Sequence, residues 1–321
     1  MYKIEPDTGY CISKVLRDYS VQIEPDVCLL LASPLWLGMN ISEGNGYVPV
    51  GRDVIAYLNP LFLENFSVNA NCLFLPVRGN SRDHFTFLIK RLKNQRKTLV
   101  KLSGDVLGRE GNMGDPEGPA APVLGVIEHI LEHPGSNGAV VDLAFSERST
   151  LSLSEADFVE YWHSDTTARI NTEWFTLIPS QGKLTWALME QKLRASFARQ
   201  YHHLRSNRGG IISGSAVLEY LQSSLCQGSG RYGDPLSHFY LWRKGKGIID
   251  LRKRYAYALN KADAMGPAVA ATQQGLLGSA RAWEDFYGVL DRNMTARQLS
   301  EQYEALIAKE NELIGNFKAM L

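Results

Sequence analysis

The sequence predicts an α+β fold, in which an amino-terminal domain with an antiparallel sheet is followed by an all-helical domain. In the amino-terminal half, short apolar segments alternate with turns and loops. From about Lys183 onward, long segments carry apolar residues at helical spacing and are joined by short breaks, which is typical of a helical bundle. This change of pattern lies near Pro179 to Gly182. We therefore assign residues 1–180 and 181–321 to the two domains.

The composition is that of an ordinary globular protein. Hydrophobic residues make up 45% and charged residues 21% of the 321 residues, which allows a sizeable core. Basic and acidic residues number 34 each, and this balance argues against sequence-independent binding to nucleic acid or to an anionic membrane. No apolar run is long enough to span a membrane, and the first ten residues lack the pattern of a secretory signal. We therefore expect a cytoplasmic protein.

The first predicted helix carries a cysteine, Cys11, in its opening turn. Asp7 and Thr8 can cap this helix, and its apolar residues recur at the spacing of one buried face: Ile12, Val15, Leu16 and Tyr19. The partial positive charge at a helix start favours the thiolate, which is the nucleophilic form of cysteine. Cys11 is therefore a candidate nucleophile. The alternative is a small buried hydrophobic residue, as free cysteines commonly are.

The segments after this helix follow in order. Residues 27–36 form a buried helix or strand, which periodicity does not decide. Cys72–Val77 and Thr98–Leu102 are predicted strands. The basic run from Lys90 to Lys97 can attract an acidic partner such as a carrier protein, or can simply be solvated. Residues 104–122 are predicted to form a long loop, which in a compact domain is more often functional than not.

A hairpin is predicted next. The apolar segments Val123–Leu131 and Ala139–Phe145 flank a turn-forming cluster at residues 133–138. If the turn centres on residues 135 and 136, antiparallel partners have numbers that add up to 271. His129 then lies directly opposite Asp142, with the two side chains on the same face and close enough to hydrogen-bond. A register slip of one residue would remove this match.

Helices are predicted after the hairpin. Ser154 and Asp157 have the spacing of a capping box at the start of a helix through Phe158 and Trp162. In the second domain, the helical pattern covers residues 184–204, 213–225, 236–264, 268–290 and 295–321.

We expect no metal and no cofactor. The four cysteines form no CxxC pair, and adjacent His202 and His203 on a helix point in different directions, which argues against a shared metal. The glycines at 209, 210 and 214 lack the lysine and threonine that a nucleotide-binding loop requires, so they indicate the start of a helix.

Three far-separated residues match the needs of a thiol enzyme, which are a nucleophile, a base and a group that orients the base. Cys11, His129 and Asp142 supply them in a papain-like order, with the cysteine on a helix and the other two on neighbouring strands. In that scheme Cys11 attacks a carbonyl or thioester, and its backbone N–H helps to stabilise the oxyanion. The alternatives are an ordinary strand histidine and an ordinary acidic residue at a strand end.

Several motifs resemble the amino-terminal domain of the butirosin biosynthesis protein H family, and they lie at residues 11–19, 35–39, 51–52, 98–102, 140–142 and 151–153. The helical remainder, with Ser213–Leu218 and Ala282–Phe286, is similar to the helical domain that commonly follows. The resemblance implies a papain-like cysteine acyltransferase for natural-product assembly. Such an enzyme moves an acyl group from the phosphopantetheine thioester of a carrier protein to an amine.

The sequence departs from the family at two positions. The family usually has histidine before the cysteine, where this chain has Tyr10. The family's strand histidine also lies further ahead of the aspartate than His129 does. A different alignment places Ala121, Pro122 or a nearby apolar residue at that position, which leaves the site without a base.

Three functions therefore remain from the sequence. The first is an acyltransferase in which Cys11 accepts an acyl group from an acyl or peptidyl carrier protein and passes it to a small-molecule acceptor. The second is a catalytically silent relative that binds a carrier protein or stabilises a partner enzyme. The third is a thioesterase or peptidase-like hydrolase that uses water as acceptor. The sequence leaves the acyl group, the acceptor and a homodimeric state open.

Overall fold

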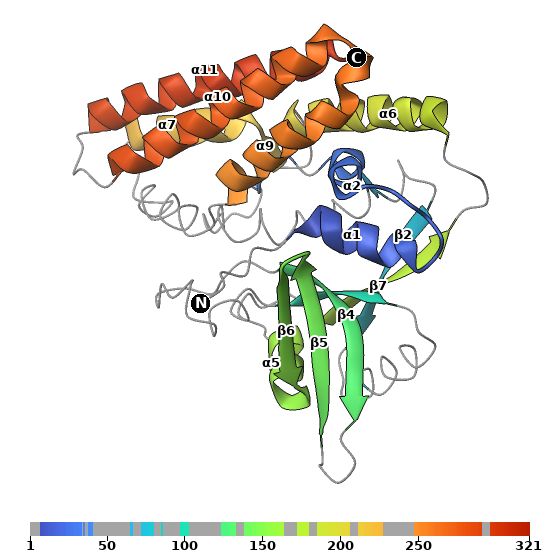
Figure 1. The fold of residues 1–321 in the computed structure, drawn as a ribbon. Coiled ribbons are helices and arrows are strands. Elements are labelled where there is room, and N and C mark those ends of the chain that lie inside the picture. Colours follow the sequence, from blue (N-terminus) through green and yellow to red (C-terminus); the bar gives the residue numbers. More distant parts are fainter. Residues whose placement is uncertain are drawn as a thin grey trace. The chain divides into compact units, whose positions relative to one another are not determined.

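The protein combines helices with an antiparallel sheet in a computed structural model (Figure 1). Its chain divides into two compact units, Met1–Leu29 with Phe66–Lys183, and Leu30–Asn65 with Leu184–Leu321. Residues 30–65, which the sequence analysis assigned to the first domain, belong to the second unit. The structure describes residues 7–33, 35, 38–40, 65–66, 72–79, 85, 97–102, 123–132, 138–163, 172–179, 185–205, 211–226, 247–290 and 296–321.

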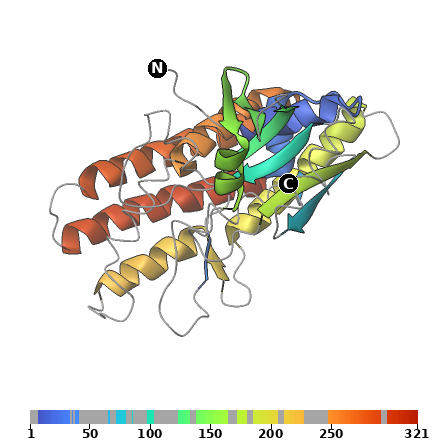
Figure 2. The ribbon, with the colours of Figure 1, turned by 90° about the horizontal axis from the view of Figure 1, so that it is seen from below.

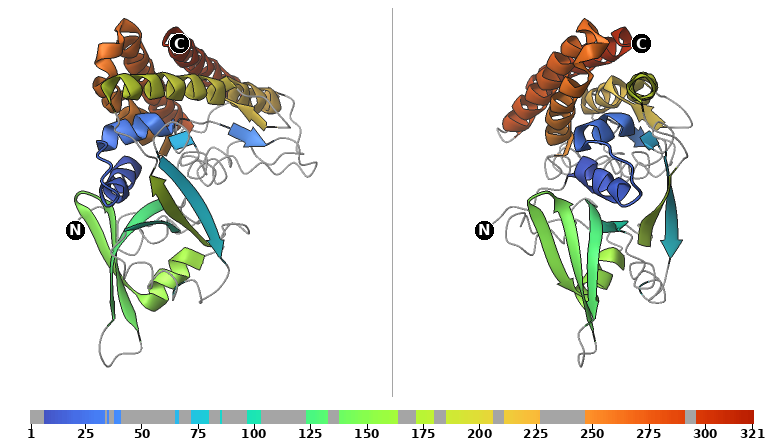
Figure 3. Two further views of the ribbon diagram at one scale, coloured as in Figure 1. Left: turned by 90° about the vertical axis from the view of Figure 1, so that its right-hand side faces the viewer. Right: turned by 45° about the vertical axis from the view of Figure 1, so that its right-hand side comes forward.

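The first unit is built on a sheet in which every adjacent pair of strands is antiparallel. Within the described residues the sheet has six strands, in the order β2-β7-β3-β4-β5-β6 (Figure 3). The sheet confirms the predicted strands at residues 72–77 and 98–102. In sheet order, the strands are Cys72–Gly79, Thr172–Pro179, Thr98–Leu102, Val123–Glu132, Ala139–Ser146 and Ser149–Ser154.

The β4–β5 hairpin has the predicted register. His129 lies opposite Asp142, and the neighbouring pairs toward the turn follow the same alignment. The register then shifts between Ile127 and His129, which makes Glu128 the extra residue of a β-bulge. Glu128 shares the α1 face of β4 with Leu124 and Val126, as strand alternation requires, and the bulge brings the next residue, His129, to the same face, opposite Asp142.

Helix α5 (Glu155–His163) covers one face of the sheet. Its Phe158 and Trp162 are buried in a cluster with Val141 and Leu143 of β5. The predicted cap at the start of this helix is present: the Ser154 hydroxyl accepts from the Asp157 N–H at 3.2 Å and donates to the Asp157 carboxylate at 2.8 Å.

Helix α1 (Thr8–Arg17) covers the other face, where it contacts β3, β4 and β5. Cross-strand partners Leu99, Val126 and Ala144 are buried on this face. The first turn of α1 lies so close to the start of α2 (Pro25–Ala32) that a Cβ at Gly9 would overlap the Pro25 carbonyl oxygen. The predicted buried stripe of α1 is present at Ile12, Val15 and Leu16, each at most 1% exposed.

The second unit is mainly helical. Helices α10 and α11 pack side by side (Figure 2), and their aromatic residues Trp283, Phe286 and Tyr303 lie in one buried cluster. No helix in the described part of the chain is both long enough and apolar enough to span a membrane. The helical segments of this unit are α6 (Trp186–Arg205), α7 (Ser215–Cys226), α9 (Gly247–Ala258), the 3₁₀ turn Leu259–Met265, α10 (Pro267–Leu290) and α11 (Ala296–Ala319).

The prediction of an all-helical second domain needs one correction. Strand β1 (Gly38–Asn40) pairs antiparallel with β8 (Ile211–Ser213) in a short ladder. The β-branched Ile211 and Ile212 favour a strand, and a three-residue strand is too short for a periodic pattern to reveal. Gly214 follows with φ of +62° and begins the turn into α7, as expected for glycine in a left-handed conformation.

The buried face of α6 is fixed by hydrogen bonds to the chain that follows α2. The Ser196 hydroxyl lies 2.6 Å from the Leu30 carbonyl oxygen and 3.0 Å from that of Leu31, and so satisfies carbonyl groups at the end of α2. The Ser33 hydroxyl donates to the Ser196 carbonyl oxygen at 2.8 Å. The Gln200 amide exchanges hydrogen bonds with both backbone groups of Leu35. These bonds fix the rotation of α6 about its axis.

A buried ion pair joins α9 to α11. Arg252 is 4% and Glu310 0% exposed, and the guanidinium binds the carboxylate through both of its terminal nitrogens. The Ser279 hydroxyl and the Trp283 ring N–H also donate to Glu310, at 2.7 and 3.1 Å. Because every partner is satisfied, the pair positions three helices against one another without leaving an unpaired charge.

Glu310→Gln should lower the free energy of unfolding by about 3–5 kcal/mol, because it leaves the Arg252 charge buried without its counterion. Urea denaturation followed by circular dichroism measures this change. Lys253→Met is the matched control, since it breaks an ion pair with Glu284 whose side chains are 45% and 44% exposed; its effect should stay below about 1 kcal/mol. Equal effects of the two variants would show that the buried Arg252–Glu310 pair matters no more to stability than an exposed ion pair.

Stability should also fall as the pH drops below about 6.5, because the folded state favours the neutral form of the half-buried His203. Burial, followed by the charges of Arg199 and His202, holds the pKa of His203 below its ordinary value of 6.5. The Asn65 amide nitrogen lies 3.3 Å from Nδ1 of the ring, a hydrogen bond that needs an unprotonated nitrogen. The unfolded state therefore takes up the proton first, and the stabilisation is lost between 6.5 and the lower folded pKa.

Urea unfolding midpoints between pH 8 and pH 5 measure this dependence. In His203→Gln the urea midpoint should depend less on pH. His202→Gln changes an exposed neighbour of His203 and should keep most of the pH dependence. An unchanged pH dependence in His203→Gln would show that other groups cause it.

Candidate active site

The start of α1 is formed as the sequence predicts, and the N–H groups of Tyr10 and Cys11 in its first turn already have hydrogen-bond acceptors. Asp7 is the N-cap residue, and its carboxylate accepts from the Tyr10 N–H at 2.9 Å. The Cys11 N–H donates to the Asp7 carbonyl oxygen, also at 2.9 Å. The expectation that this N–H helps to stabilise an oxyanion is therefore corrected, because the helix itself already uses the group.

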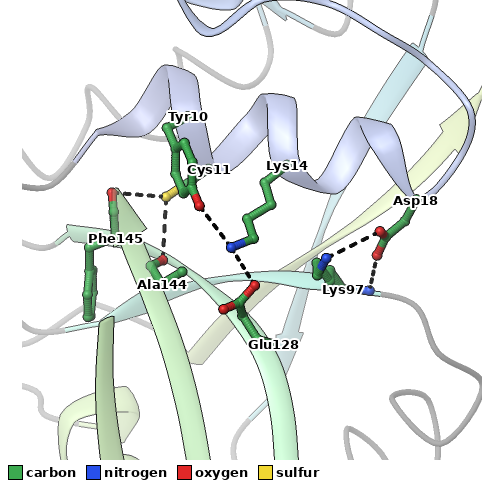
Figure 4. A network of polar contacts seen from close by, with 8 residues as sticks. All are labelled: Tyr10, Cys11, Lys14, Asp18, Lys97, Glu128, Ala144 and Phe145. Carbon is green, nitrogen blue, oxygen red and sulfur yellow. Dashed lines mark hydrogen bonds and ion pairs between the residues drawn. The ribbon is translucent and has the colours of Figure 1, made fainter. Parts of the chain in front are cut away.

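The Cys11 thiol is enclosed by main-chain oxygens. The side chain is 0% exposed, and its sulfur lies 3.5 Å from the carbonyl oxygen of Phe145 and 3.7 Å from that of Ala144 (Figure 4). The carbonyl oxygen of Leu124 lies 3.8 Å from the sulfur. A thiol can donate its hydrogen to one of these oxygens, whereas a thiolate would face the negative ends of three carbonyl dipoles. The surroundings therefore favour the protonated thiol, which is a poor nucleophile.

A polar network lies beside the cysteine on the same helix. Lys14 donates to the Tyr10 hydroxyl at 2.8 Å and forms an ion pair with Glu128, the residue at the bulge (Figure 4). Burial lowers the pKa of Lys14, but the hydrogen bonds to Glu128 and Tyr10 outweigh burial and raise the pKa above its ordinary 10.5. Lys14 is therefore a fixed cation, and it cannot take a proton from Cys11.

His129 and Asp142 lie together on a different part of the sheet. They face each other across β4 and β5, and the Ser152 hydroxyl on β6 donates to the Asp142 carboxylate at 2.6 Å. His129 is exposed. Figure 3 shows these strands running on beyond α1 toward the hairpin turn.

The structure does not bring the three predicted residues to one point. Phe145, whose carbonyl oxygen contacts the sulfur, and Asp142 are three residues apart on β5, or about 10 Å of strand. Leu124 and His129 are five residues apart on β4, or about 15 Å. These spans exceed the reach of a hydrogen bond, and the Lys14–Glu128 ion pair intervenes. His129 and Asp142 are paired as predicted, but away from Cys11.

The strand beside the sulfur fits the alternative alignment. The β4 residue whose carbonyl oxygen contacts the sulfur is Leu124, which is apolar and buried. Ala121 and Pro122, most of the Lys90–Lys97 run and the loop at residues 104–122 lie outside the described residues. In the described part of the chain, no three His, Cys, Asp or Glu side chains are grouped to hold a metal ion.

Sequence reasoning did not identify the Tyr10–Lys14–Glu128 network. The four-residue spacing of Tyr10 and Lys14 places them on one side of a helix, and this signal was available. The contact of Lys14 with Glu128 was not predictable, because it depends on where α1 lies along β4.

Comparison with known proteins adds no relative. No protein-family model matches the chain, and the search of curated proteins gave no significant match. The resemblance to the butirosin biosynthesis protein H family therefore rests on the short sequence motifs alone.

The cysteine can be tested by its reactivity. In the native protein, iodoacetamide should label Cys11 at least about a hundredfold more slowly than in urea, because the sulfur is enclosed and protonated. Peptide mass spectrometry over a time course gives the rate at each cysteine. Cys28, which is also buried, is the internal reference. Labelling of native Cys11 as fast as an unfolded cysteine, or faster, would show that the site opens and is reactive.

Proposed function

We propose that this protein binds an acyl or peptidyl carrier protein and does not use Cys11 as a nucleophile. One observation carries the proposal: the Cys11 sulfur is 0% exposed, and three main-chain carbonyl oxygens surround it. In this reading Cys11 anchors α1 to the sheet. The partner class comes from the resemblance to the butirosin biosynthesis protein H family.

The finer fold assignment belongs to the same proposal. A capped helix with a cysteine in its first turns, packed on an antiparallel sheet, is the arrangement expected of a papain-like domain. A mainly helical unit accompanies it, as in the family. These features support a papain-like scaffold in which the β4 residue whose carbonyl oxygen contacts the cysteine, Leu124, is apolar. A role in natural-product biosynthesis follows from the resemblance alone.

The acyltransferase is the competing hypothesis, and it makes a different demand on the molecule. Catalysis would require α1 to move until the sulfur is exposed, and it would require a base within about 3 Å of the sulfur. The hydrolase alternative makes the same two demands. Neither Lys14, which is held protonated, nor His129, which lies further along β4, meets them in the described structure.

The proposal predicts binding without acyl transfer. Acylated and holo forms of an acyl carrier protein and of a peptidyl carrier protein should bind with dissociation constants that Cys11→Ala changes by less than about threefold. Isothermal titration calorimetry measures the binding. Intact-protein mass spectrometry after incubation with the acylated form should show no acyl adduct on this chain.

Cys28→Ala is the matched control, since Cys28 is equally buried and belongs to the same unit. An acyl adduct that is lost in Cys11→Ala and kept in Cys28→Ala would establish the acyltransferase. Release of free acid alone would favour the hydrolase. If neither carrier protein binds and no adduct forms, the proposal fails.

A further inference from the structure

Helix α6 presents a face that no described element covers. Its buried residues include Leu193, Phe197 and Leu204, and the hydrogen bonds of Ser196 and Gln200 to the chain after α2 fix which way the helix is turned. The opposite side carries the exposed residues Gln191, Arg194, Ala195, His202 and Arg205.

This helix is positively charged in a chain that is neutral. It contains four basic residues and one acidic residue, whereas the whole chain has 34 of each sign. At 100° per residue, Arg194 and Arg205 follow one edge of the exposed face, and Lys192 and Arg199 follow the other. The result is two rows of positive charge along a helix of 20 residues, which is about 30 Å long.

Few of these charges are neutralised by described carboxylates. Arg194 pairs with Glu190, but both side chains are well exposed, and such a pair contributes little energy. Arg205 lies over the Tyr201 ring and donates to its hydroxyl, and Arg199 donates to the Asn65 amide oxygen at 3.5 Å. The guanidinium groups of Arg199 and Arg205 are therefore oriented by neutral partners and keep their charge.

The strip of helix surface between the two rows of charge carries two of the shortest side chains of α6. Ala195 and Ala198 lie there, with Gln191 before them and His202 after them. Small side chains let a second helix approach closely. Carboxylates on both sides of such a helix can then reach the arginines and lysine that flank the strip.

We propose that the exposed face of α6 docks an acidic helix of the carrier protein. The inference rests on the proposed function and names the surface that performs it. Charge complementarity decides the occupant, because two rows of cations separated by alanines match a helix with carboxylates on both flanks. A second copy of this chain is a poorer match, because the chain has no net charge.

Helix α11 shows why this face is distinctive. It is also long and exposed, but its basic residues alternate with acids. Arg297 pairs with Glu301, and Lys309 pairs with Glu312. An acidic partner would meet as many negative as positive groups there.

The test compares charge reversals on the two helices. Arg194→Glu with Arg205→Glu changes α6, and Arg297→Glu with Lys309→Glu makes the same change in net charge on α11. Binding of a holo-acyl carrier protein and a holo-peptidyl carrier protein is measured by titration calorimetry at two salt concentrations. The α6 variant should bind at least about tenfold more weakly and with a smaller salt dependence, and the α11 variant within about twofold of the original.

A third variant separates shape from charge. Ala195→Trp adds bulk to the strip without changing any charge, and it should also weaken binding about tenfold. Circular dichroism establishes that each variant is folded, which is expected because all five positions are exposed.

The outcomes separate the two proposals. Unchanged binding in the α6 variant, or an equal loss in both charge-reversal variants, would overturn the docking surface while carrier-protein binding stands. Normal binding by Ala195→Trp would also overturn the close approach of a helix to the strip. If the original protein binds neither carrier protein, the proposed function fails first, and the docking inference fails with it.

Discussion

The close packing of α1 on the sheet is the constraint on which the character of the first unit depends. To bring the Cys11 sulfur within 3.8 Å of three main-chain carbonyl oxygens, the helix has to lie directly on β4 and β5. That proximity removes water from the thiol and places three carbonyl acceptors around it. In our proposal, the helix position that would suit a nucleophile at a cleft instead makes Cys11 a structural residue, because its side chain is 0% exposed.

The hairpin was predictable, and the site was not, for different physical reasons. Turn residues and alternation fix which residues of two neighbouring strands meet, so the pairing of His129 with Asp142 follows from the local sequence. Where α1 comes to lie along those strands depends on contacts between residues more than 100 positions apart, such as Cys11 and Leu124. No periodic pattern in the sequence predicts where α1 lies. The β-bulge at Glu128 also shifts the strand register, and the turn residues do not predict that shift.

The second unit shows a related limit. The helices of the bundle are long and strongly periodic, so α6, α7, α10 and α11 were predicted within a few residues. Of the segment predicted over residues 236–264, the part before Gly247 lies outside the described residues. The hydrogen bonds between α6 and the chain at Leu30, Leu31 and Leu35 were not predicted. In the sequence, Ser196 and Gln200 look like ordinary surface residues of α6. They are 0% exposed, and they bind backbone groups of Leu30, Leu31 and Leu35. The sequence alone does not tell whether a polar residue on a helix faces water or is buried against a hydrogen-bond partner.

The interleaving of the two units has a consequence for biosynthesis. Residues 30–35 leave the ribosome about 160 residues before Ser196 and Gln200, the side chains that bind them. Until α6 has been translated, the carbonyl groups at the end of α2 lack those partners, and the entire sheet of the first unit emerges in the meantime. The second unit can therefore reach its final structure only after translation has passed α6. Its assembly is late and depends on contacts between distant residues, although the hydrogen bonds within its helices join residues close in sequence.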